Sequence, residues 1–118
     1  MTKIGVITCD NIRDKHCMGC IKCFKAAANK EGHFSEHEDD IEVVFWTGCG
    51  GCPGLYMPKF ALIHEMTEKL GREYDVIHIG TCVVKAAKTS GCPIELETMK
   101  KNLETKWGKK VIIGTHTY

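Results

Sequence analysis

Four short apolar runs alternate with segments of helical periodicity along the 118 residues of this chain. Strands are predicted at residues 3–8, 41–46, 75–80 and 110–114, and helices at about 18–30, 53–70 and 93–107. Strands separated by helices are typical of a parallel sheet with helices on its faces. The sequence therefore predicts one domain, residues 1–118, with a small doubly wound α/β fold, flavodoxin-like or Rossmann-like, of about four parallel strands with helices on both faces.

Two connections in this pattern have no clear periodicity. Residues 33–40 are polar and acidic, and we expect a solvated loop with His33 and His37 in water rather than on a metal. Residues 83–91 are expected to form a less patterned connection. His78 lies inside a predicted strand, so a buried histidine with satisfied hydrogen bonds is expected there.

Composition limits the partners of this protein. A formal net charge of +1 provides no basic surface for nucleic acid. The apolar runs are far shorter than the roughly 20 residues of a membrane span. Because Met1 leads directly into a strand pattern, no signal peptide is expected and the protein should be cytoplasmic. Eight cysteines are unusual there, since cytoplasmic disulfides do not persist.

Most of the cysteines follow predicted strands or begin predicted helices. Right-handed crossovers place the carboxyl ends of parallel strands along one edge of the sheet. The residues expected at this edge are Cys9, Cys49, Cys52, Cys82, Cys92 and His116. A single cysteine is often only a small buried apolar residue. Six residues at one edge are poorly explained by chance.

Thiols gathered at one edge indicate a metal. Thiolates raise one another's pKa, and a bound metal ion or cluster compensates their charge. Cys17, Cys20 and Cys23 form a second group, spaced like the start of a ferredoxin-type cluster run, although Ala27 replaces its fourth cysteine. A buried helix face would explain the same spacing. The predicted metal ligands are Cys9, Cys17, Cys20, Cys23, Cys49, Cys52, Cys82, Cys92 and His116.

The identity of the metal stays open between an iron–sulfur cluster and zinc. Iron–sulfur clusters favour all-thiolate ligation, and the excess of cysteine over histidine favours this choice. His116 together with Cys49, Cys52 and Cys82 would instead make an acceptable tetrahedral zinc site. Redox chemistry, electron transfer or metal handling would follow, with a redox protein as a candidate partner.

Two other functions fit parts of the sequence. Cys49-Gly50-Gly51-Cys52 after an apolar strand looks like the active-site segment of thioredoxins. This allows a dithiol-disulfide oxidoreductase with Cys49 as nucleophile and Cys52 as resolving thiol. A helix rather than a strand follows Pro93, so a thioredoxin fold is not expected. An anion site at the glycine-rich helix start is less well supported than a thiol site. No substrate or catalytic residue is identified, and the question of enzyme activity stays open.

Taken whole, the sequence resembles the CGGC domain family of bacteria and archaea. The similarity spans nearly the whole chain, and residues 9–23 are similar to the family's cysteine-bearing start. The segments that carry it are Cys49-Gly50-Gly51-Cys52-Pro53-Gly54, Cys82 after the strand 75–80, Cys92-Pro93 and Gly114-Thr115-His116. The resemblance implies a stand-alone metal-binding domain, with zinc usually suggested and no established reaction.

Overall fold

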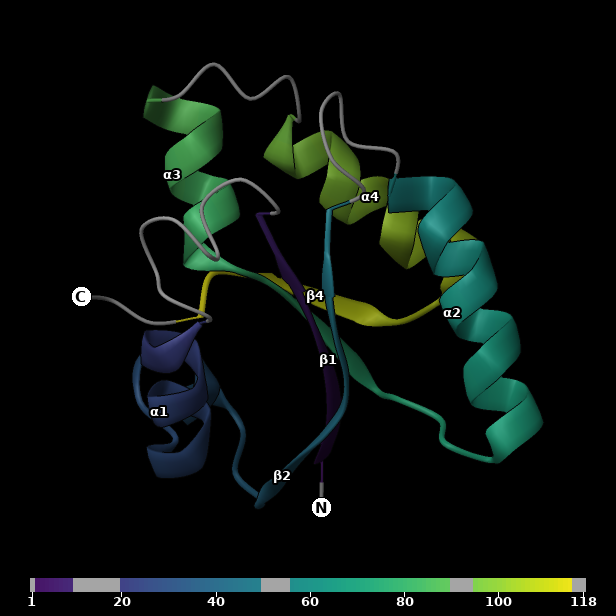
Figure 1. The fold of residues 1–118 in the computed structure, drawn as a ribbon, viewed down its shortest axis with the longest axis horizontal. Coiled ribbons are helices and arrows are strands. Elements are labelled where there is room, and N and C mark those ends of the chain that lie inside the picture. Colours follow the sequence, from purple (N-terminus) through teal and green to yellow (C-terminus); the bar gives the residue numbers. More distant parts are fainter. Residues whose placement is uncertain (1, 10–19, 50–55, 90–94, 116–118) are drawn as a thin grey trace.

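A computed structural model of the protein describes residues 2–9, 20–49, 56–89 and 95–115, apart from the side chains of 87–89. Its strands form one sheet (Figure 1). They are β1 (Thr2–Thr8), β2 (Ile41–Gly48), β3 (Val76–Ile79) and β4 (Lys110–Ile113). Each neighbouring pair is parallel, in the order β2-β1-β3-β4. The predicted parallel α/β sheet is therefore confirmed.

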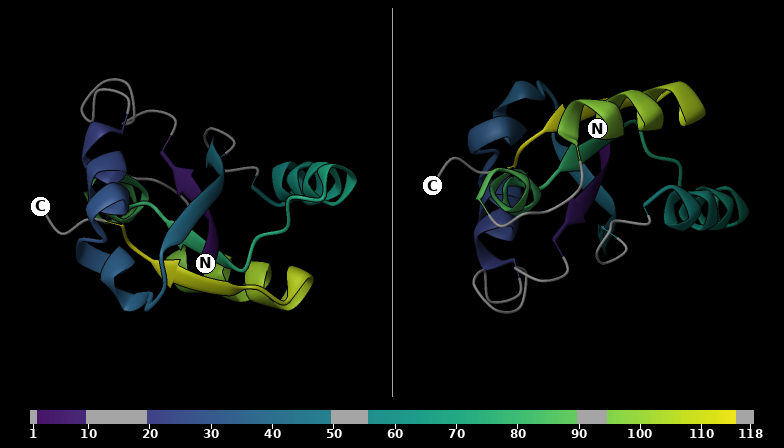
Figure 2. Two further views of the ribbon diagram at one scale, coloured as in Figure 1. Left: turned by 90° about the horizontal axis from the view of Figure 1, so that it is seen from below. Right: turned by 90° about the horizontal axis from the view of Figure 1, so that it is seen from above.

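Helices cover both faces of this sheet (Figure 2). They are α1 (Ile21–Asn29), the 3₁₀ helix η1 (Gly32–Glu36), α2 (Tyr56–Leu70), α3 (Thr81–Thr89) and α4 (Leu96–Trp107). Buried residues of α1 and η1 pack with Ile4 and Val6 on one face. Those of α2, α3 and α4 pack with Ile7 and Ile77 on the other. Among the described residues, no helix is long and apolar enough to cross a membrane.

The path of the chain through the sheet explains why both faces are covered. The first crossover moves outward from β1 to β2, whereas the second returns past β1 to β3 and the third continues to β4. Because crossovers between parallel strands are right-handed, this reversal moves the helices from one face to the other. The reversal lies between β1 and β3. Doubly wound folds bind their ligands at the carboxyl ends of such strands.

Helix α3 corrects the prediction of a less patterned connection at residues 83–91. The helix runs from Thr81 to Thr89, and its Val83 and Ala86 are 1% and 4% exposed. Residues three apart share one side of a helix, and alanine and lysine are strong helix formers. Among the side chains of α3 described after residue 82, only these two are buried, and so narrow an apolar stripe is not recognised as a period, which is why the prediction was wrong.

The segment 33–40 is also less solvated than predicted. Helix η1 turns Phe34 into the core, where it is fully buried, and His37 follows it at 9% exposure. The Phe34 ring packs on His78, with ring centroids 4.6 Å apart. Because residues three apart lie on the same side of a 3₁₀ helix, this one turn presents both rings to the sheet. A single phenylalanine in an acidic segment was too weak a signal to predict this.

His37 and His78 form a buried hydrogen-bonded pair. Their Nε2 atoms lie 2.8 Å apart, and His78 Nδ1 lies 3.0 Å from the carbonyl oxygen of Gly114. A carbonyl oxygen only accepts, so His78 carries its proton on Nδ1 and its Nε2 accepts from His37. Burial lowers the pKa of His78 to about 4, against the opposing effect of the Gly114 hydrogen bond. Burial also lowers the pKa of His37, and the positive charge of Lys110 adds to that effect. Both rings are therefore neutral at pH 7, and the prediction for His78 is confirmed.

Gly5 of β1 lies against the ring of Phe45 on β2, next to an irregularity in the register of these strands. A Cβ atom at this position would overlap the Phe45 ring. The ring is held in place by edge-to-face contacts with Phe60 and Tyr74, at centroid distances of 5.6 and 5.1 Å. The ring of Phe45 has little freedom to move away from a larger residue at position 5.

We expect Gly5→Ala to lower the free energy of unfolding by about 1–3 kcal/mol, since the added methyl group overpacks this contact. Urea denaturation of the purified protein measures the change. Phe45→Leu should make room, so that Gly5→Ala costs less in that background than in the wild type. Equal costs in the two backgrounds would show that the Phe45 ring is not the obstacle.

His78 makes stability depend on pH in the acidic range. The ordinary pKa of a histidine, 6.5, applies to the unfolded chain, whereas the pKa of His78 is about 4 in the folded protein. Between these two pH values the unfolded chain therefore binds more protons than the folded protein. The neutral His78 therefore stabilises the folded state fully at pH values above 6.5, and this stabilisation is lost as the pH falls towards 4. We expect the free energy of unfolding to fall by about 2 kcal/mol from neutral pH to pH 5. Urea denaturation of the wild type and of His78→Gln tests this, because the variant should show a flatter pH dependence. Parallel curves for the two proteins would contradict it.

Candidate metal centre

The carboxyl ends of three adjacent strands bring three of the predicted cysteines together. Cys9 follows β1, Cys49 follows β2, and Cys82 is the second residue of α3, just after β3. Their exposures are 6%, 5% and 4%, and all three belong to one cluster of buried residues. Three thiols far apart in the sequence thus share one edge of the sheet.

Cys82 accepts a hydrogen bond from the end of a neighbouring strand. The backbone N–H of Cys9 donates to Cys82 Sγ across 3.1 Å. Cys82 also lies in the first turn of α3, at the positive end of the helix dipole. Both features would stabilise negative charge on a metal-bound sulfur. The two residues follow β1 and β3, so this contact lies where the strand order reverses.

Gly80 allows the ends of β1 and β3 to approach this closely. Its N–H donates to the carbonyl oxygen of Ile7 across 2.7 Å. A Cβ atom on Gly80 would lie 2.7 Å from that oxygen and 3.3 Å from Cys82 Sγ. Only glycine fits between the strand end and the sulfur without displacing one of them.

Thr81 and Thr115 join the carboxyl ends of β3 and β4. The N–H of Thr115 donates to Thr81 Oγ1 at 3.0 Å, and the N–H of Thr81 donates to Thr115 Oγ1 at 3.2 Å. Cys23 Sγ, from the first turn of α1, lies 3.2 Å from the same Thr115 oxygen. The second cysteine group of the sequence therefore reaches this edge through Cys23.

Cys20 precedes α1 with a backbone conformation that is rare for its residue type. Its φ angle is +67°, in the left-handed region, and its side chain is 2% exposed. A non-glycine residue there is strained, and such strain clusters at functional sites. Cys23 is also buried, at 3% exposure. These two cysteines could bind a metal, or they could serve only as buried apolar residues at the start of α1.

Four of the nine predicted ligands, namely Cys17, Cys52, Cys92 and His116, lie outside the described residues. Within residues 2–9, 20–49, 56–89 and 95–115, no three Cys, His, Asp or Glu side chains are grouped closely enough to hold a metal ion. In the same part of the chain, no disulfide links any two of the five cysteines. The described residues therefore supply sulfur donors but do not complete a metal site by themselves.

The histidines of the described residues contact other groups than the cysteines. His33 Nδ1 lies 3.3 Å from a carboxylate oxygen of Glu36, and His64 Nε2 lies 3.2 Å from one of Glu68. The side chain of His64, in the middle of α2, is 30% exposed. His37 and His78 bind each other. Sulfur is therefore the main donor type at this edge.

Two threonines that were not predicted from the sequence organise this edge. Thr81 and Thr115 each follow a glycine directly after a strand, as Gly80-Thr81 and Gly114-Thr115. The same dipeptide at the ends of two strands is a signal that could have revealed the pair. The dipeptides alone do not show that the two threonines meet, because the adjacency of β3 and β4 is a property of the folded sheet.

Comparison with known proteins agrees with the cysteine pattern. A sequence model of the CGGC domain matches residues 3–116, a range that includes all eight cysteines. The uncharacterized protein MJ0582 of Methanocaldococcus jannaschii is 32% identical, over 98% of this chain and 87% of that protein. No solved structure is significantly similar to the chain. With cysteines at its strand ends and a match over nearly its whole length, this chain belongs to the CGGC domain family.

Proposed function

We propose that this protein holds a thiolate-ligated metal centre at the carboxyl edge of its sheet. The observation that carries the proposal is the burial of Cys9, Cys49 and Cys82 in one cluster at three adjacent strand ends. Soft and borderline metals prefer thiolate ligands. The other proposed ligands are Cys17, Cys20, Cys23, Cys52, Cys92 and His116.

The donor chemistry of the described residues fits such a centre. The Cys9 N–H and the start of α3 would both stabilise a metal-bound sulfur at Cys82. Several buried thiolates require a compensating cation, since like charges disfavour one another. A metal ion or cluster bound at the ends of β1, β2 and β3 would also stabilise the folded state relative to the unfolded chain.

We infer that an iron–sulfur cluster fits the donors better than zinc. The described histidines are engaged with Glu36, with Glu68 and with each other, which leaves an excess of sulfur. All-thiolate ligation is the usual form for iron–sulfur clusters. A zinc site with mixed ligands would depend on His116. A cluster would supply one-electron transfer, with redox sensing or metal handling as related roles and a redox protein as partner.

Protein purified without oxygen should contain iron and a matching amount of acid-labile sulfide. Elemental analysis together with a sulfide assay measures both. Zinc without sulfide would support the metal centre but replace the cluster with a zinc site. Neither metal above trace level would contradict the proposal, and thiol-disulfide exchange by Cys49 and Cys52 would then be the function to assay.

The variant Cys82→Ser should lower the metal content per chain by about tenfold or more, since ligand loss affects metal affinity at least as strongly as loss of an outer-shell partner. Ala86→Ser provides the matched control. Ala86 is buried in the same cluster, one turn further along α3, and the change adds a similar hydroxyl group without removing a thiol. Equal metal loss in both variants would indicate that packing, not ligation, was disturbed.

A further inference from the structure

Strand β2 has the sequence of an interior strand but lies at an edge of the sheet. Residues 41–46 are apolar apart from Glu42, a composition that predicts burial on both faces because interior parallel strands are nearly continuous apolar runs. Within the described residues, β2 pairs only with β1. All of its residues from 41 to 47 are only partly buried, whereas every residue of β3 is buried. Strand β2 is therefore more apolar than its partial burial within a single chain requires.

The helices on either side of β2 expose apolar side chains in the same region. Among the described residues, the large apolar side chains exposed by half or more are Ile21, Phe24, Leu62, Met66 and Leu70. The first two belong to α1, and Phe24 stacks on Trp46 of β2 with ring centroids 4.0 Å apart. The other three lie four residues apart along α2. Leu62, Met66 and Leu70 line one groove, and exposed apolar surface of this kind marks interaction sites.

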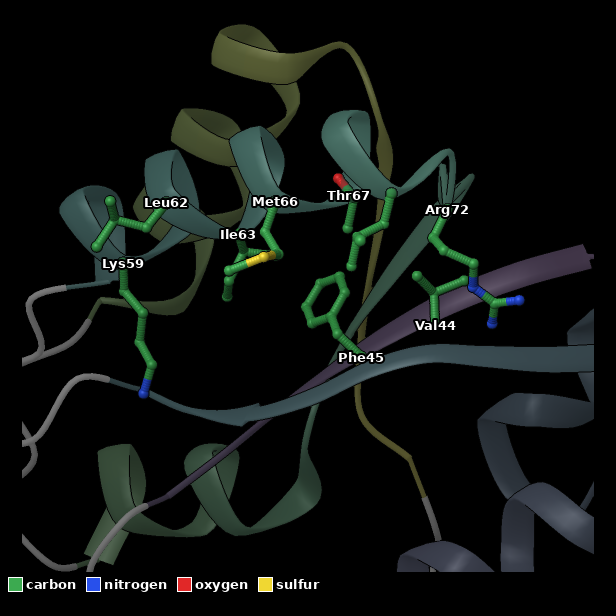
Figure 3. Close-up of a pocket in the computed structure, with 9 residues that line it drawn as sticks. Val44, Phe45, Lys59, Leu62, Ile63, Met66, Thr67 and Arg72 are labelled. Atoms are coloured by element: carbon green, nitrogen blue, oxygen red, sulfur yellow. The ribbon is translucent and has the colours of Figure 1, made fainter.

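A groove of about 480 Å³ separates α2 from β2 (Figure 3). Its walls are mainly apolar and include Val44, Phe45, Leu62, Ile63, Met66 and Leu70. Lys59 and Arg72 lie at its opposite ends (Figure 3). Arg72 is paired with Glu42 across 2.8 Å. Lys59 makes no ion pair with any of the described residues, and it lies towards the carboxyl end of β2 (Figure 3).

The opposite edge of the sheet is protected in the usual way. Strand β4 has four residues and begins with the exposed Lys110. Short edge strands and edge lysines prevent unwanted pairing between sheets. Strand β2 is twice as long, with eight residues, and carries one charged residue, Glu42. The two edges are therefore built differently, and β2 is the edge suited to pairing.

We propose that β2, α1 and α2 form a two-fold symmetric interface with a second copy of this chain. The two β2 strands pair antiparallel, so that two four-stranded sheets become one continuous sheet. The exposed side chains of α1 and α2 pack against their counterparts in the partner. Cys20 and Cys23, next to Ile21 and Phe24, are buried, so the exposed residues of this interface are not themselves proposed metal ligands and the interface can be tested separately from the metal centre.

Charge favours a second copy in this orientation. The residues that precede β2 are acidic, namely Glu38, Asp39 and Asp40, whereas Glu42 at its start is already paired with Arg72. Lys59 lies at the other end of the groove. Antiparallel pairing brings Lys59 of each copy towards the acidic end of the other, whereas parallel pairing would bring like ends together.

Light scattering after size-exclusion chromatography tests the interface on the full chain. At about 100 µM the wild type should have twice the 13.2 kDa mass of one chain. Met66→Glu and Phe24→Glu each bury an unpaired charge in the dimer but not in the monomer, and they should raise the dimer Kd by about 100-fold or more. Thr105→Glu is the matched control, because Thr105 is exposed on α4, and it should leave the dimer intact. Circular dichroism shows whether each variant keeps its fold.

A monomeric wild type at that concentration would overturn the proposal, as would a dimer that survives both Met66→Glu and Phe24→Glu. Binding of a small apolar molecule or a foreign peptide by a monomer would equally count against it. Lys59→Glu tests the orientation and should raise the Kd about tenfold. Hydrogen exchange gives a second measurement, because the amide groups of β2 that point away from β1 should be protected only in the dimer. An unchanged Kd for Lys59→Glu would rule out the antiparallel arrangement.

Discussion

The close approach of β1 and β3 at their carboxyl ends determines most of this structure. Gly80 donates a hydrogen bond to the Ile7 carbonyl across 2.7 Å, and the N–H of Cys9 donates to Cys82 Sγ across 3.1 Å. A side chain at position 80 would collide with that carbonyl oxygen. Because the strand order reverses at this point, the same contact marks where the helices change faces and where the cysteines meet.

The two faces of the sheet are packed by different means. The face under α2 and α4 is filled by apolar and aromatic side chains. The face under α1 and η1 also contains the His37–His78 pair. A buried polar group costs free energy unless it is hydrogen-bonded, and here His78 is bonded through both ring nitrogens. The pair therefore ties η1 to β3 and to Gly114 at the end of β4, a directional link that apolar contacts do not provide.

The proposed metal centre and the proposed dimer contact lie on different sides of the sheet. The metal centre would lie at the carboxyl edge, and the dimer contact along the lateral edge at β2. Strand β2 serves both, since Cys49 follows it and Val44 and Phe45 line its groove. Antiparallel pairing turns the partner around, so the two carboxyl edges would point in opposite directions. Each centre would then remain open to its own redox partner.

By itself the sequence determined the alternation of strands and helices, and with it the parallel sheet and the common edge of Cys9, Cys49 and Cys82. These follow from local periodicity and from the handedness of crossovers, which apply to any chain of this pattern. Only the tertiary structure decided the order of the strands. An apolar run such as residues 41–46 indicates that a strand will be covered, but not whether the same chain or a second one covers it. The His37–His78 contact joins residues 41 positions apart, and neither residue has a local signal for the other. Contacts of this kind depend on where the strands lie in space, which no short stretch of sequence contains.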